Sequence, residues 1–175
     1  MQGTPSWDLF LIIFFIVSTG YGFVLQRDKV IVTLLSIYAG VVIANILGDP
    51  MKLFFQGDKT VANQIFIKAN MSPFTIQAML FAVTTVLVSA RSGIGSRSSK
   101  GALSTFELAL FSFLNSTLIL AAVFSFMTPE MRGNFIQTSK IARMIIENQS
   151  WWFIAPIIAL IATGGMGKSR SSSDY

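Results

Sequence analysis

The sequence contains no cysteine and no histidine. These absences exclude disulfides, thiol nucleophiles, serine–histidine–aspartate triads and nearly all zinc sites, because each needs a thiolate or an imidazole. Charge is scarce as well, since 12% of the 175 residues are charged, whereas a soluble domain carries about 25%. The composition therefore predicts a single domain that lies in a membrane.

The few charged residues also exclude functions. The formal net charge is +5, and in a membrane protein a basic excess is typical of cytoplasmic loops and contact with anionic lipid rather than nucleic acid. No apolar segment has a charge near its middle, which ion-coupled transporters and proton relays usually need. Walker loops, dinucleotide fingerprints and paired carboxylates are missing. We expect no enzyme, no cofactor and no metal site.

Apolar residues are abundant, at 53% of the chain. A helix needs about 20 predominantly apolar residues to cross a bilayer. The pattern predicts an all-α polytopic membrane protein with spans over residues 7–25, 30–48, 73–90 and 106–127, and a fifth, shorter helix over 151–166. Residues 1–166 would form one transmembrane domain, followed by a polar tail at 167–175.

Two segments are predicted to be amphipathic rather than spanning. Residues 49–71 follow a turn signal, Gly48-Asp49-Pro50, and their apolar pieces are too short to cross. We interpret them as interfacial helices, with a re-entrant hairpin as the alternative. Residues 129–148 start with a Thr-Pro cap and place apolar and charged side chains on opposite faces, which predicts a helix on the membrane surface. Packing under a neighbouring subunit is the alternative interpretation.

Small residues recur at every fourth position of the second span, at Ser36, Gly40, Ala44 and Gly48. In lipid, close backbone contact at small residues is a main source of helix association. The first span carries Ser18 and Gly22, also four residues apart, and a very short polar connection joins the two spans. We therefore predict a tight hairpin in which Ser18 and Gly22 meet Ser36 and Gly40.

Polar side chains interrupt the third and fourth spans, at Gln77, Thr84, Asn115, Ser116 and Thr117. Such groups usually bond from one transmembrane helix to another. In an oligomer they would instead line a polar path. Both interpretations stay open on the sequence.

Basic residues predict the orientation. They stand in short connections at Arg27, Lys29, Arg91, Arg97 and Lys100. Basic residues in short loops mark the cytoplasmic side. This places the N-terminus outside and the C-terminus in the cytoplasm.

The first two spans resemble a known family. Residues 7–10 (WDLF) lead into 20–23 (GYGF), then an abrupt polar break at 26–30 (QRDKV), then the small-residue helix over 36–48. This order resembles the colicin V production (CvpA) family of small bacterial inner-membrane proteins. The resemblance implies a multi-pass protein of the inner membrane with a role in toxin export or envelope maintenance, and no established chemistry.

Two functions remain as hypotheses. The first is a CvpA-like accessory or scaffold protein whose partners are the lipid bilayer and either further copies of itself or other membrane proteins. The second is a small channel or pore-forming, holin-like subunit lined by the polar residues of the third and fourth spans. Neither hypothesis involves nucleic acid.

Overall fold

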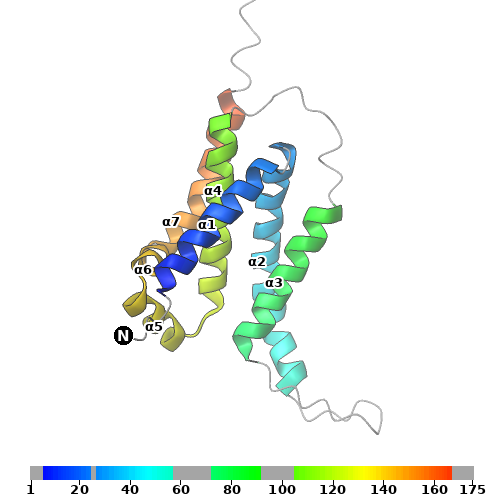
Figure 1. Cartoon of the computed structure of the whole chain (residues 1–175). Coiled ribbons are helices and arrows are strands. Elements are labelled where there is room, and N and C mark those ends of the chain that lie inside the picture. Colours follow the sequence, from blue (N-terminus) through cyan, green and yellow to red (C-terminus); the bar gives the residue numbers. More distant parts are fainter. Residues whose placement is uncertain (1–5, 25–26, 57–71, 92–104, 167–175) are drawn as a thin grey trace, which may run out of the picture.

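The computed structural model describes residues 6–24, 27–56, 72–91 and 105–166, and every element in these ranges is a helix (Figure 1). The helices are α1 (Trp7–Val24), α2 (Arg27–Gln56), α3 (Pro73–Arg91), α4 (Thr105–Phe126), α5 (Pro129–Thr138), α6 (Lys140–Glu147) and α7 (Gln149–Met166). The predicted all-α fold class is confirmed.

Four of the helices, α1 to α4, are long and apolar enough to cross a membrane. A fifth crossing is present if α6 and α7, which meet at an angle of 72°, form one broken span. The successive long helices run alternately up and down the bundle (Figure 1). The chain is therefore a multi-pass helical membrane protein with four to five spans, as predicted.

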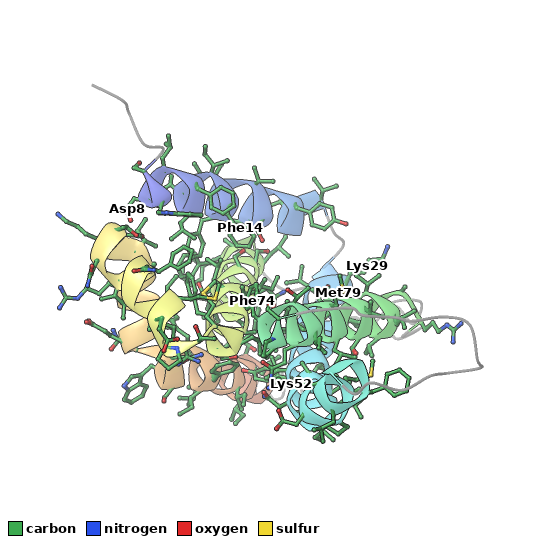
Figure 2. All side chains as sticks on the ribbon, turned by 90° about the horizontal axis from the view of Figure 1, so that it is seen from below. Asp8, Phe14, Lys29, Lys52, Phe74 and Met79 are labelled. Atoms are coloured by element: carbon green, nitrogen blue, oxygen red, sulfur yellow. The ribbon has the colours of Figure 1, made fainter. Side chains whose placement is uncertain are left out.

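Helix α4 lies at the centre of this arrangement. Within its apolar window 67% of the residues are buried, against 11% for α1 and for α3. Viewed along the bundle, α1 lies on one side of α4, α7 on another, and α2 with α3 on a third (Figure 2). Since α4 contacts every other long helix, its side chains decide how the spans are held together.

Helix α2 does not end where the sequence predicts. It continues through Pro50 to Gln56, so the predicted turn at Gly48-Asp49-Pro50 and the separate segment from residue 49 are wrong up to residue 56. Proline removes one backbone N–H, but its fixed φ is helical, so the flanking turns can continue. Lys52 pairs with Asp49 at 2.8 Å across this turn. The rest of the predicted amphipathic segment, residues 57–71, lies outside the described residues.

The predicted amphipathic helix over 129–148 is two helices rather than one. Helix α5 begins as expected, with Thr128 as N-cap and Pro129 in the first turn. Ser139 then adopts an extended backbone (φ −139°, ψ 124°), and α6 starts after it with the Ser139 hydroxyl accepting from the Ala142 N–H at 3.0 Å. The apolar and charged residues of 129–148 keep a continuous helical periodicity, which predicts one helix. The serine breaks it into two because it caps the start of a second helix.

The two ends of the bundle differ. The ends of α1, α3 and α7 and the starts of α2 and α4 lie toward one end, and α5 and α6 lie at the other, beside the start of α1 (Figure 1). We call these the loop end and the α5–α6 end. The short helices therefore cover only one of the two predicted membrane faces.

Candidate functional site

The first contact of interest joins α1 to α4. The hydroxyls of Ser116 and Ser18 form a hydrogen bond of 2.7 Å. One turn along, a Cβ added to Gly22 would lie 2.5 Å from the Ser112 Cβ, closer than real Cβ atoms come. Small residues therefore face small residues here, and the two backbones approach closely.

The second contact joins α2 to α3. A Cβ on Gly40 would clash with the Thr85 hydroxyl and lie 3.0 Å from the Phe81 carbonyl oxygen. A Cβ on Gly48 would lie 2.9 Å from Cγ of Gln77. Gln77, a predicted lining residue, thus packs against a glycine of the neighbouring helix. The small-residue face of α2 is a helix-packing face, as the spacing predicts.

The other two members of that face are buried as well. Ser36 is fully buried and donates to the Val32 carbonyl of its own helix at 2.8 Å. Ala44 is fully buried beside Phe81 of α3 and Leu118 of α4. All six predicted packing residues are therefore placed inside the bundle or at helix contacts.

The predicted pairing between the first two spans is wrong. Ser18 and Gly22 meet Ser116 and Ser112 of α4 instead of Ser36 and Gly40. The reason is that α1 crosses the bundle obliquely and packs on α4 and α6, while α2 packs on α3 and α4 (Figure 1). A short connection makes two helices consecutive without making them pack along their length.

Three adjacent polar residues of α4 have three different hydrogen-bond partners, in α2, in α1 and in α4 itself. Asn115 donates from Nδ2 to the Val30 carbonyl of α2 at 2.9 Å. Ser116 meets Ser18 of α1. Thr117 donates to the carbonyl of Phe113 in its own helix at 2.9 Å. Consecutive helical residues differ in direction by about 100°, so these three side chains do not line one common polar path. Thr84, the remaining predicted lining residue, is half-buried on α3.

We expect Asn115→Leu to change the free energy of unfolding by no more than about 1 kcal/mol in either direction. The interhelical bond to Val30 contributes about that much. Against it, Asn115 Oδ1 is buried and accepts no hydrogen bond among the described residues, and an unsatisfied acceptor costs a comparable amount. Ser116→Ala, which leaves Ser18 without its partner, is the comparison. SDS titration of the purified protein, followed by circular dichroism, measures the free energy of unfolding of both variants. A loss above about 2 kcal/mol for Asn115→Leu, roughly twice the contribution of the interhelical bond, would contradict this expectation.

A carboxylate at the α5–α6 end binds the start of a helix far along the chain. Asp8 Oδ1 accepts from the Ser139 hydroxyl at 2.5 Å and from the Ile141 N–H at 3.2 Å. Asp8 lies at the end of α1 that meets α5 and α6 (Figure 2). The first N–H groups of a helix lack partners within it and favour a negative charge. Asp8 and Ser139 therefore cap α6 together.

Sequence reasoning assigned no role to Asp8 or Ser139. Asp8 stands at the edge of an apolar span, where an exposed carboxylate is unremarkable, and its partner is 131 positions away in the chain. The available signal was Ser139 itself, a cap-type residue within an amphipathic stretch.

Asp8→Ala is expected to release α6 from α1, because the α6 N-terminus then keeps only its Ser139 cap. Limited proteolysis in detergent at Lys140 and Arg143 should become clearly faster. Asp8→Asn, which retains an acceptor oxygen, should lie between wild type and Asp8→Ala. Equal cleavage rates for all three proteins would show that the Asp8 contact does not hold α6.

Two further bonds tie α7 to the bundle. The Tyr38 hydroxyl of α2 donates to the Phe153 carbonyl at 2.6 Å, and Gln149 Nε2 donates to the Ala121 carbonyl of α4 at 2.9 Å. Both side chains donate to backbone carbonyls, so no complementary pair of side chains in the sequence indicates these bonds. They fix the side of the bundle on which α7 lies.

The predicted cytoplasmic basic residues are described in part. Lys29, at the start of α2, and Arg91, at the end of α3, are exposed, and both positions belong to the loop end. The Arg27 side chain lies outside the described part of the chain, as do Arg97 and Lys100. The two described residues thus lie at one end of the bundle, while Lys140 and Arg143 of α6 lie at the other, and the orientation stays a prediction.

An apolar cavity of 320 Å³ lies between α1, α4, α6 and α7. Two of its walls are α1 and α6, through Ile12, Phe15, Ile16, Ile141, Met144 and Ile145. Phe113 and Thr117 of α4 and Trp152 of α7 complete it. Since the Thr117 hydroxyl is bonded to its own helix, the cavity presents no free polar group of that residue.

Among the described residues, no group of three or more Asp or Glu side chains is placed to hold a metal ion. Comparison of the chain with models of known families, with curated proteins and with solved structures finds no match. What the fold defines is the class: an all-α, multi-pass membrane protein built around a central span.

Proposed function

We propose that the chain is a CvpA-like accessory or scaffold protein of the bacterial inner membrane that acts without catalysis in envelope maintenance or toxin export. The observation that carries this proposal is how the buried polar groups are used. Ser18, Asn115 and Ser116 bond one span to another, and Tyr38 and Gln149 bond α7 to the bundle. Such groups serve the architecture, which is what a scaffold requires.

The channel hypothesis has less support. It needs Asn115, Ser116 and Thr117 on one polar surface, and these residues face α2, α1 and the apolar cavity. Self-association, by contrast, is compatible with the apolar surface of α1 and α3, where Ile13, Val17, Val83 and Val86 are exposed. We therefore retain self-association as part of the proposal and treat ion flux as the outcome that would replace it.

For the orientation we propose the N-terminus and the α5–α6 end outside, and the loop end and C-terminus in the cytoplasm. The supporting observation is that Lys29, at the start of α2, and Arg91, at the end of α3, adjoin connections at the loop end, since basic residues in short connections mark the cytoplasmic side. A reporter active only in the cytoplasm, fused after Tyr175, should be active. A silent reporter on a stably expressed fusion contradicts this orientation.

The function is tested by deleting the gene in its host. The deletion strain should become sensitive to detergents that the intact envelope excludes, or should lose toxin export. Expression of the wild-type protein or of Gly20→Leu should restore the wild-type behaviour of the strain, whereas Gly22→Leu should not. Of these two glycines, only Gly22 lies against another helix. A deletion strain with unchanged barrier and export, or ion flux from purified protein in liposomes, argues against the scaffold.

A further inference from the structure

The apolar cavity between α1, α4, α6 and α7 lies at a defined depth in the membrane. Ile12 and Ile16 are five and nine residues after Trp7, the first residue of the span. At 1.5 Å per residue this is about 8 to 14 Å along the helix. Half of the hydrocarbon core is about 15 Å, so the α1 wall of the cavity lies within one leaflet, while Phe113, near the middle of α4, reaches toward the bilayer midplane.

Helix α6 marks the boundary of that leaflet. Ile145 is buried and lines the cavity, while Lys140 and Arg143 are exposed on the opposite face. A short helix with one apolar and one charged face lies at the level where headgroups give way to acyl chains. The cavity therefore begins where the acyl chains of membrane lipids begin.

The cavity opens toward the lipid. Ile16 is 67% exposed, Met144 54% and Phe113 42%, and all three line the cavity. Phe113 also stacks on Phe15, with 5.4 Å between the ring centroids, and meets Trp152 edge-on, with 6.5 Å between the centroids. Three aromatic rings thus form a wall across α1, α4 and α7, opposite the aliphatic residues of α6.

We propose that this cavity binds one acyl chain of a membrane phospholipid. The lining presents apolar surface to the cavity, which favours an apolar occupant over water, because water needs polar partners. The cavity, at 320 Å³, is at the small end of ligand pockets, which start at about 300 Å³. A flexible chain anchored by a headgroup beside α6 fits both the shape and the depth.

Trp152 lines the cavity, so its fluorescence can report whether an acyl chain occupies the cavity. The chain has three tryptophans. The double variant Trp7→Phe, Trp151→Phe leaves Trp152, and Trp7→Phe, Trp152→Phe leaves the exposed Trp151 at a similar depth on the same helix. Both are placed in nanodiscs with a low mole fraction of phosphatidylglycerol brominated on its acyl chains. Fluorescence of Trp152 should be quenched at least twofold more than that of Trp151.

The cavity is then filled in the Trp152 background. Ile12→Phe with Ile16→Phe should reduce the quenching of Trp152 to the level of Trp151. Ile13→Phe, at an exposed position of α1 that does not line the cavity, should leave it unchanged. Equal quenching of the two tryptophans, or an excess that survives filling, overturns the proposal. An equal excess with a brominated free fatty acid in place of the phospholipid also overturns it, because the headgroup then plays no part.

Discussion

Replacing Gly22 by leucine is expected to separate α1 from α4 and to destabilise the protein by about 3 kcal/mol, the upper end for overpacking. The added Cβ alone would lie 2.5 Å from the Ser112 Cβ. Ser112 is buried and its Cβ cannot move without its backbone, so the helices must part. Separation also breaks the hydrogen bond between Ser18 and Ser116. SDS titration of the purified protein, followed by circular dichroism, measures the loss.

Gly20→Leu is the matched control, since the same substitution is made two residues earlier in the same helix. A Cβ on Gly20 meets nothing within 4 Å. Leucine is also the better helix former by about 1 kcal/mol, so stability should be unchanged or slightly raised. If both variants lose stability equally, the effect belongs to glycine in a helix rather than to the contact with α4.

Gly40→Leu is expected to part α2 from α3 and to abolish the native elution peak in detergent gel filtration. The Cβ would clash with the Thr85 hydroxyl and press on the Phe81 carbonyl, which belongs to the backbone and cannot rotate away. Val42→Leu, at an exposed position of the same helix, should elute like wild type. A normal peak for Gly40→Leu would refute the close α2–α3 packing.

A smaller change at the same contact tests its atoms. In Gly40→Ala the closest obstacle is the Thr85 hydroxyl, which has no hydrogen-bond partner among the described residues. Thr85→Ala alone should therefore cost little, and added to Gly40→Ala it should recover part of the lost stability. A double-mutant cycle with no coupling would place the clash elsewhere.

Local features of this fold were predictable from the sequence. The spans follow from apolar length, and the start of α5 follows from Thr128 and Pro129. The small residues at Gly40 and Gly48 correctly indicate a closely packed face. Each of these features depends on residues within a few turns of one another.

The partners of those faces were not predictable in the same way. The spacing of Ser18 and Gly22 indicates close packing, but α4 offers small residues at Ser112 and Ser116 and so competes with α2. The Asp8 contact with Ser139 joins residues that are 131 positions apart in the chain. At Pro50 a local turn signal was overridden by the helix around it. Where a helix face can pack on more than one neighbour, the packing of the whole bundle decides which neighbour it contacts.

The central place of α4 has a consequence for the order in which the protein is built. Proteins are synthesised from the N-terminus at about 5–20 residues per second, so α1, α2 and α3 enter the membrane before α4 exists. Helices α2 and α3 can pair at once through Gly40 and Gly48. The face of α1 that carries Ser18 and Gly22 has no partner until Ser112 and Ser116 of α4 have been synthesised and inserted. A nascent chain stalled after α3 would hold a finished α2–α3 pair beside an unattached first helix.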